Sequence, residues 1–509
     1  MNTNKLSTIT PKQAGIAPRD LLNFLDLVEK KQIHLHNFVM IKGNQVFAQG
    51  SYAPCRRDDL HTLFSMSKSF TSTAIGFAVQ EKRLTLTDKV TDFFKEELAG
   101  KEELICENMK KMTVHHLITM NTGHTDAEDE MFVDMEKDWC ISFLTSQVEK
   151  EPGSWFLYNT RATYMLSAII QKVTGQLLFD YLKPRLFEPL GFSDGIWWEK
   201  SPQGINTGGF GLNISVEDLA KFGMFVKNKG FYNGKQLLSS QWFEDAAKPW
   251  SDSSNTWEGE NKYGYGYQFW LCHIPGVFRG DGAFGQYCVV MPREDMLFIT
   301  MAGELDMQKI LDTFWESICE KKETGRQDPA DTDWQEDQCE LEKRLNDLEI
   351  SAYYEEAGIE GADLKLPENV WGKEYVLEEN ALHITSLRFV QIDSEEDKCR
   401  LELKNGENID VLTVSVKDWT PGEIHVDGNY TDLSKYSFRA GLYPKCHVKG
   451  CSKDNAFYMD MLFQETSFQD TWKVTFEENE IRLSVKRNTG FVPAEVCARG
   501  TCSEYFNLS

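Results

Sequence analysis

The order of hydrophobic and polar positions predicts a sheet assembled from both ends of the N-terminal region. Residues 37–48 (NFVMIKGNQVFA) hold two β-prone runs around Gly43-Asn44, a dipeptide suited to the positive φ of a tight hairpin. A second pair of β-prone runs, 286–291 and 296–301, comes late in the region, and a helical pattern over 306–319 follows it. Two hairpins on either side of a helical middle indicate one sheet completed by both ends of a domain.

A helix is predicted over residues 65–81. Its apolar side chains recur at helical spacing from Phe70 to Ala78, which gives the helix one apolar face. Charged residues are nearly absent between Lys68 and Glu81. The helix is therefore expected to be buried on most of its sides.

The pattern changes after residue 320. The chain of 509 residues is longer than one hydrophobic core usually serves. Residues 321–350 begin with an acidic, polar linker and end in a short amphipathic helix, which is marked by Leu341, Leu345 and Leu348. We therefore expect a first domain over 1–320 and a second domain over 351–509.

Residues 351–509 carry short β-prone runs separated by turn formers such as Lys404-Asn-Gly-Glu. This pattern is typical of an all-β domain, either a sandwich or a barrel, a lipocalin-like barrel included. The predicted strands are 374–377, 381–385, 399–403, 411–416, 472–476 and 481–485.

Composition and charge restrict the partners. The net charge is −25 and the sequence contains no run rich in Lys and Arg, which argues against a nucleic-acid partner. Simple solubility is the preferred explanation of the acidity. No secretory signal and no apolar run long enough to span a bilayer are visible, and the twelve cysteines are scattered as free thiols would be. We expect a cytoplasmic protein that acts on a small molecule and binds no membrane; the oligomeric state is left open.

Ser65-Met-Ser-Lys68 at the start of the predicted helix is the first candidate for chemistry. A serine hydroxyl must lose its proton as it attacks, and a lysine three positions later lies one helical turn above it on the same face. A desolvated amine can accept that proton, and the helix dipole favours a developing alkoxide. A capping serine followed by a solvated lysine is the alternative, but an exposed lysine rarely opens an otherwise uncharged helix.

Five segments carry a second kind of signal, in this order along the chain: 64–70 (FSMSKSF), 114–124 (VHHLITMNTGH), 152–160 (PGSWFLYNT), 208–218 (GGFGLNISVED) and 280–287 (GDGAFGQY). Together they resemble the serine β-lactamase, penicillin-binding-protein and class C-like esterase superfamily. The similarity runs from about residue 10 to 318. The resemblance implies an α/β (α+β) domain of β-lactamase/transpeptidase type, with an antiparallel sheet flanked by helices and a helical subdomain.

The resemblance also implies roles for single residues. Ser65 would attack a carbonyl and become acylated, Lys68 would take or relay its proton, and Tyr158 would share that role and protonate the leaving group. The backbone N–H groups of Ser65 and Ala283 would form the oxyanion hole. This chemistry requires no cofactor and no metal.

Two motifs depart from the family pattern. Thr160 stands where the second motif usually offers Asn or Ser to hold a substrate amide. The third motif commonly carries a cation, but here it is Gly280-Asp281-Gly282, followed closely by Phe284. Arg279 precedes it, yet neighbouring strand residues point to opposite faces. Since Asp281 would repel a substrate carboxylate, efficient β-lactam hydrolysis is not expected.

Other candidates are weaker. His124 lies beside Gly123, but such a histidine is more often structural. The residues Cys446, His447, Cys451, Cys497 and Cys502 would form a zinc site only if their two stretches met. Six aromatic side chains are expected either to line the cleft or to pack the framework, and the sequence favours neither alternative. They are Tyr263, Tyr265, Tyr267, Phe269, Trp270 and Phe284.

Three hypotheses follow. The first is a serine hydrolase that cleaves a small ester, amide or peptide through an acyl-enzyme on Ser65. The second is a β-lactamase or D-Ala-D-Ala carboxypeptidase of penicillin-binding-protein type. The third is a catalytically silent binding protein that keeps only the fold.

Overall fold

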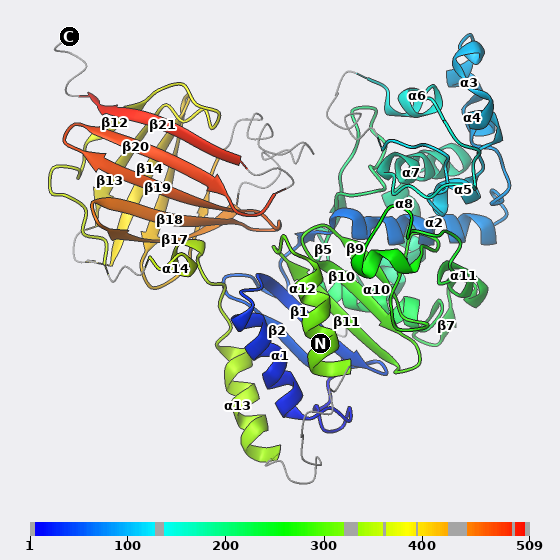
Figure 1. The fold of residues 1–509 in the computed structure, drawn as a ribbon, viewed down its shortest axis with the longest axis horizontal. Helices are drawn as coiled ribbons and strands as arrows, with labels where there is room; N and C mark the ends of the chain where they lie inside the picture. Colours follow the sequence, from blue (N-terminus) through cyan, green and yellow to red (C-terminus); the bar gives the residue numbers. More distant parts are fainter. Residues whose placement is uncertain are drawn as a thin grey trace. The chain divides into compact units, whose positions relative to one another are not determined.

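A computed structural model describes residues 6–127, 137–319, 334–359, 363–392, 395, 397–425, 445–490 and 494–503. The chain forms two compact units, shown in Figure 1. Unit 1 comprises Met1–Ser51, Arg57–Ala302 and Asp306–Leu348, and unit 2 comprises Tyr52–Arg56, Gly303–Leu305 and Glu349–Ser509. Most of the predicted linker, 320–333, lies outside the described residues, whereas the short helix predicted after it is α13, Trp334–Asn346.

Unit 1 contains a six-stranded antiparallel sheet with the strand order β2-β1-β11-β10-β9-β8 (Figure 1). The strands are β1 Leu35–Lys42, β2 Gln45–Ser51, β8 Trp270–Leu271, β9 Phe278–Gly282, β10 Gln286–Met291 and β11 Met296–Ala302. Both predicted hairpins are confirmed, and the turn between β1 and β2 has Gly43 at φ +62°. Because β1 also pairs with β11, the two ends of the region complete one sheet, as the pattern predicts.

Helices surround this sheet and form a separate helical subdomain. The helices of unit 1, apart from α13, are α1 Pro18–Lys30, α2 Ser67–Gln80, α3 Lys95–Leu98, α4 Glu107–Lys111, α5 Val114–Ile118, α6 Trp139–Leu144, α7 Thr160–Thr174, α8 Leu178–Leu182, α9 Glu188–Leu190, α10 Val216–Lys227, α11 Ser240–Ala246 and α12 Gln308–Phe314. The shorter helical turns are η1 Phe64–Met66, η2 Val90–Phe94, η3 Glu102–Leu104, η5 Lys183–Phe187, η6 Gly259–Tyr263 and η7 Trp315–Cys319. Short strands complete the unit: β3 His61–Thr62, β4 Trp197–Trp198, β5 Leu212–Ile214, β6 Phe231–Tyr232 and β7 Lys235–Gln236.

Aromatic and small residues attach the helices to the two faces of the sheet. On one face, Phe298 of β11 lies edge-on to Phe24 of α1 and stacks on Phe314 of α12, with ring centroids 5.9 and 4.0 Å apart. On the other face, Gly223 lets α10 approach β10, since a Cβ there would lie 3.0 Å from Cys288 Sγ. The sheet is therefore covered on both faces, and its core is shared with the helices.

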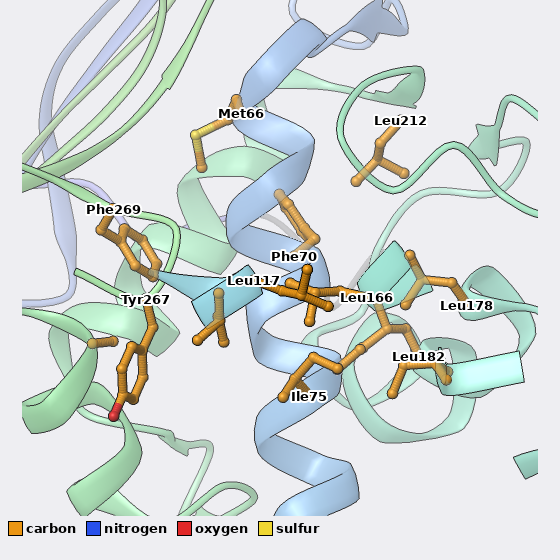
Figure 2. Packing of buried hydrophobic residues seen from close by; sticks show 14 of the residues in the cluster. Met66, Phe70, Ile75, Leu117, Leu166, Leu178, Leu182, Leu212, Tyr267 and Phe269 are labelled. Carbon is orange, nitrogen blue, oxygen red and sulfur yellow. The ribbon is translucent and has the colours of Figure 1, made fainter. Parts of the chain in front are cut away.

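Helix α2 runs through the middle of the largest hydrophobic cluster of unit 1 (Figure 2). Every residue from Ser67 to Ala78 is buried, which confirms the expectation of a helix enclosed on most sides. Phe70 stacks on Phe222 of α10 with ring centroids 3.8 Å apart, and Figure 2 shows Leu117 and Leu166 packed beside it. A helix held this firmly fixes the position of the residues at its start.

Unit 2 is an all-β domain, as predicted, and its fold is a nearly closed barrel. One antiparallel sheet has the order β15-β14-β13-β12-β21-β20-β19-β18-β17-β16, and its edge strands β15 and β16 lie against each other. The Cβ that Gly422 of β16 lacks would lie 2.6 Å from Leu412 Cδ2 of β15. The elements are α14 Tyr353–Glu356, β12 Glu374–Leu377, β13 Ser386–Gln391, β14 Lys398–Asn405, β15 Asn408–Ser415, β16 Thr420–Glu423, β17 Lys445–Lys453, β18 Ala456–Phe463, β19 Gln469–Glu477, β20 Glu480–Arg487 and β21 Ala494–Cys502.

The strand predicted over 381–385 is wrong. These residues form a turn in which the Asn380 side chain accepts from the Leu382 N–H and donates to the Ile384 carbonyl. His383 sits at φ +52°, outside the extended region. The asparagine supplies local hydrogen bonds that compete with strand pairing, so β13 begins only at Ser386.

Across the residues that the structure describes, none of the helices combines the length and the apolar character needed to cross a bilayer.

Candidate active site

Ser65 and Lys68 lie at the head of α2. Ser65 is half-buried in η1, and Lys68, 1% exposed, stands in the first turn of the helix. Lys68 Nζ donates to Ser65 Oγ at 2.9 Å and to the Gly209 carbonyl at 2.8 Å. The amine is therefore enclosed, held by two neutral oxygens and placed within proton-transfer distance of the serine hydroxyl.

Tyr158 meets this pair from the loop before α7. Lys68 Nζ lies 4.8 Å from the centroid of the Tyr158 ring. The loop is fixed because the Asn159 side chain caps α7 by accepting from the Arg161 N–H. Thus Ser65, Lys68 and Tyr158, separated by up to 93 positions in the sequence, converge on one place.

Gly209, which belongs to the segment 208–218, closes the far side of the lysine. A Cβ at this position would lie 2.6 Å from Thr160 Cγ2 and 3.5 Å from Lys68 Nζ. A larger residue would displace the carbonyl that accepts from the amine. Thr160, half-buried at the start of α7, therefore packs against the backbone that holds Lys68.

Strand β9 lies against the head of α2 through its two glycines. A Cβ at Gly280 would lie 2.2 Å from Met66 Sδ, and one at Gly282 would lie 2.2 Å from the Leu63 carbonyl oxygen. A side chain at 282 would collide with backbone, whereas one at 280 would require the end of the Met66 side chain to move. The segment Gly280-Asp281-Gly282 itself carries no cationic side chain.

Arg279 and Asp281 occupy the opposite face of β9 and pair with each other. Arg279 Nε donates to Asp281 Oδ2 at 3.0 Å, and the guanidinium is 1% exposed. Burial raises the pKa of Asp281, whereas Arg279 and, more weakly, Lys68 lower it. Arg279 is thus engaged by a carboxylate rather than open to a substrate anion.

Backbone strain marks both sides of the predicted oxyanion hole. Phe64, directly before Ser65, has φ +46°, and Phe284, directly after Ala283, has φ +66°. Their rings meet edge to face at 5.1 Å. Bulky residues in the left-handed region cost roughly 1–3 kcal/mol each and persist where the surrounding structure over-determines them. The contact between the two rings couples the η1 turn to the turn between β9 and β10.

The six predicted cleft aromatics separate into two groups. Tyr265 and Trp270 contact the Tyr158 ring, with Trp270 stacked on it at 5.3 Å, and Phe284 contacts Phe64. Sequence reasoning missed Trp257, whose ring lies 6.2 Å from that of Tyr158. The signal that could have found it is a tryptophan inside the polar segment 252–261 (DSSNTWEGEN). The remaining three pack elsewhere: Tyr263 beside His273, Tyr267 on Trp250, and Phe269 on Phe278.

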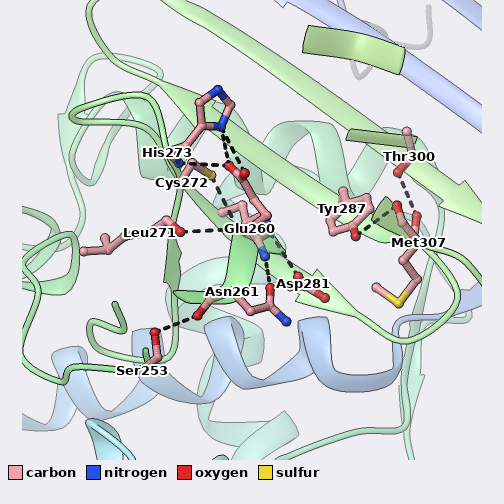
Figure 3. Close-up of polar contacts among 12 residues, drawn as sticks. Ser253, Glu260, Asn261, Leu271, Cys272, His273, Asp281, Tyr287, Thr300 and Met307 are labelled. Carbon is pink, nitrogen blue, oxygen red and sulfur yellow. Dashed lines mark hydrogen bonds and ion pairs between the residues drawn. The ribbon is translucent and has the colours of Figure 1, made fainter. Parts of the chain in front are cut away.

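A polar network on the outer side of β9 holds the segment that carries Trp257 (Figure 3). Arg279 donates to the Asn261 side chain of η6. Glu260 accepts from the His273 backbone N–H at 3.0 Å and lies 2.9 Å from His273 Nδ1. Because η6 is tied to β9 and to the residues after β8, the segment before it has a defined position.

His124 takes no part in this cluster. Its ring nitrogens lie 2.9 Å from Thr122 Oγ1 and 2.9 Å from Ser146 Oγ, and it is 1% exposed. Burial, assisted by Arg161, lowers the pKa of His124 to about 4. The histidine is therefore a neutral, hydrogen-bonded part of the framework.

The cysteines considered for zinc lie on separate strands. Cys446, His447 and Cys451 are on β17, whereas Cys497 and Cys502 are on β21, with β18, β19 and β20 between them in the sheet. Within the described ranges, His, Cys, Asp and Glu side chains form no group of three or more that could hold a metal ion.

A family model and two known proteins show what the chain is similar to. The family model described as Beta-lactamase matches residues 24–307. The chain is 25% identical over 282 residues to 6-aminohexanoate-dimer hydrolase from Paenarthrobacter ureafaciens, covering 52% of this chain and 72% of that protein. It is 22% identical over 237 residues to beta-lactamase from Escherichia coli K12, covering 40% of this chain and 61% of that protein.

Among solved structures, the octameric penicillin-binding protein homologue from Pyrococcus abyssi is similar with a TM-score of 0.42 and 16% identity, over 94% of this chain and 99% of that one. The match to the family model covers more than half of the 509 residues. The chain therefore belongs to the beta-lactamase family.

Proposed function

We propose that this hydrolase cleaves a small ester, amide or peptide through an acyl-enzyme on Ser65. The observation that carries the proposal is the 2.9 Å contact between Lys68 Nζ and Ser65 Oγ, with the Tyr158 ring 4.8 Å from the same amine. The 6-aminohexanoate-dimer hydrolase similarity supports a hydrolytic activity of this kind.

In the first half of the reaction, Ser65 Oγ bonds to the substrate carbonyl carbon while its proton passes to the neutral amine of Lys68. The oxyanion accepts from the backbone N–H groups of Ser65 and Ala283, and each such donor contributes roughly 3 kcal/mol. Tyr158 delivers a proton to the leaving alcohol or amine as its bond to the carbonyl carbon breaks. Water then attacks the ester of Ser65, and the same groups return the proton to Oγ.

The geometry disfavours the β-lactamase and D-Ala-D-Ala carboxypeptidase alternative. Recognition of a substrate carboxylate needs a cation at the third motif, but position 280 is a glycine that packs against Met66. The neighbouring Arg279 is paired with Asp281. A substrate without a carboxylate near the scissile bond is the better match to these charges.

The proposal is tested by labelling with a fluorophosphonate, followed by peptide mass mapping. We expect one adduct on Ser65, which is lost in Ser65→Ala and retained in Ser154→Ala, an exposed serine near Tyr158. Hydrolysis of chromogenic esters and anilides should follow the same pattern, with little turnover of nitrocefin. An adduct that survives Ser65→Ala would overturn the assignment. So would folded protein that reacts with neither probe nor substrate, which would support the silent binding protein.

A further inference from the structure

Trp257 stands at the open side of the catalytic cluster. Its ring lies 6.2 Å from that of Tyr158 and 5.5 Å from that of Trp270, edge-on to both. Trp257 is 39% exposed, whereas Trp270 and Tyr265, which also contact Tyr158, are 4% and 1% exposed. Of these three rings, Trp257 is therefore the one with apolar surface available to a ligand.

The loop that carries Trp257 is anchored at both ends. Ser253 Oγ donates to the Asn261 carbonyl at 2.6 Å and accepts from the Gly264 N–H at 2.9 Å. The backbone N–H of Trp257 donates to the Ser253 carbonyl at 3.0 Å. The Asn261 side chain is held in turn by Arg279 of β9 (Figure 3). The tryptophan therefore lies on a preorganised loop, so the loop loses less conformational entropy when a ligand binds.

The contact with Tyr158 decides which part of a substrate Trp257 meets. Under the proposed mechanism Tyr158 protonates the leaving group, so the leaving group lies beside the Tyr158 hydroxyl when the bond breaks. An aromatic surface next to that position favours an apolar group through burial and ring contacts. Two basic side chains of the site already have partners, because Lys68 donates to Ser65 and Gly209 and Arg279 pairs with Asp281.

We propose that Trp257 is a specificity-determining residue that selects substrates with an uncharged, apolar leaving group, an aryl or aralkyl alcohol or amine. The inference rests on the proposed function, because it assigns the leaving-group side from the role of Tyr158. The inference assigns no role to Trp257 on the acyl side of the substrate.

The test compares kcat/KM for benzyl acetate, ethyl acetate and ethyl hexanoate. The first two differ in the leaving group and the last two in the acyl group. In Trp257→Ala we expect the benzyl-to-ethyl acetate ratio to fall about tenfold, a normal size for loss of one apolar contact surface. The hexanoate-to-acetate ratio should stay within twofold, and Trp257→Phe should recover most of the benzyl preference.

Trp250→Ala is the matched control. Trp250 is 40% exposed, as Trp257 is, but it stacks on Tyr267 at 5.5 Å. This variant should keep both ratios. An unchanged benzyl-to-ethyl ratio in Trp257→Ala, or an equal loss on all three esters, would overturn the inference. Hydrolysis that persists in Ser65→Ala would instead overturn the proposed function, so the two failures are distinguishable.

Discussion

Lys68 of unit 1 and Arg487 of unit 2 are both buried basic side chains, but they donate to different kinds of group. In unit 1, Lys68 is 1% exposed and donates to neutral oxygens of Ser65 and Gly209. In unit 2, Arg487 is 7% exposed and forms two hydrogen bonds to the buried carboxylate of Asp470, at 2.7 and 3.0 Å. The arginine donates to a carboxylate, whereas the lysine donates to a hydroxyl and a carbonyl, the arrangement that the proposed role of Lys68 as a base requires.

This difference separates a structural cation from a reactive one. A guanidinium keeps its proton at any physiological pH, and a bidentate carboxylate fixes its geometry. An amine can give up its proton when it is desolvated, and the hydroxyl beside it then has an acceptor. Removing Arg487 should therefore change stability, and removing Lys68 should change catalysis.

The largest effect is expected from Lys68→Met. Without the amine, Ser65 has no base, and kcat/KM for a responsive ester should fall at least about 10³-fold. Lys68→Arg keeps the charge but cannot accept a proton, so it should be nearly as inactive. The free energy of unfolding, measured in urea, should not fall in Lys68→Met, because an apolar chain of similar volume replaces a buried amine. Substantial activity in Lys68→Arg would contradict the role as base.

Arg487→Met tests the other side of the comparison. The change leaves the Asp470 carboxylate, which is 0% exposed, buried without its partner. We expect a loss of about 4 kcal/mol from the free energy of unfolding of unit 2, measured by hydrogen exchange of the β19 and β20 amides. Adding Asp470→Leu to the same chain should restore most of this loss. If Arg487→Met without the second change is as stable as the wild type, the pair does not stabilise unit 2.

His124 sharpens the comparison as a buried base that stays neutral. Because burial lowers its pKa to about 4, the unfolded chain binds a proton below about pH 6.5 while the folded chain does not. The contribution of His124 to the free energy of unfolding is therefore complete above about pH 6.5. It decreases as the pH drops toward 4, by up to about 3 kcal/mol. His124→Gln should flatten that part of the profile of unfolding free energy against pH. The same slope in both proteins would assign the effect to other groups.

The smallest effect is expected from Arg487→Lys. The charge remains, but a single ammonium replaces the fork that makes two hydrogen bonds to Asp470. We expect unit 2 to lose about 1.5 kcal/mol, less than half of the effect of Arg487→Met. Hydrogen exchange of the same amides measures it. Equal losses in the two arginine variants would mean that geometry, and not charge, governs this pair.

Local patterns predicted the parts of the fold that local energetics decide. The hairpin around Gly43 and the pair β10 and β11 follow from alternation and turn chemistry, and α2 follows from its apolar periodicity. Closure of unit 2 was not predictable in the same way, because β12 pairs with β21 across more than a hundred residues. The turn at Asn380 was missed because side-chain hydrogen bonds outweighed the β propensity of the residues after it.

The candidate site shows the same division. Ser65 and Lys68 were predictable because one helical turn places them together, and the resemblance added Tyr158. Gly209 lies in one of the five segments that resemble the superfamily, but its hydrogen bond to Lys68 depends on tertiary packing that the sequence pattern does not reveal. Trp257 was missed because it lies in a loop that is held by tertiary contacts, and the sequence of such a loop has no hydrophobic periodicity.

The two glycines of β9 limit how this protein can change its substrate. A cationic side chain introduced at 280 would collide with Met66, and one at 282 with the backbone at Leu63. A cation at 282 would thus require the strand and the helix to separate, whereas a cation at 280 would require Met66 to adopt another conformation. On the proposed role of Trp257, substitutions in its loop are expected to change specificity while the contact between Lys68 and Ser65 remains.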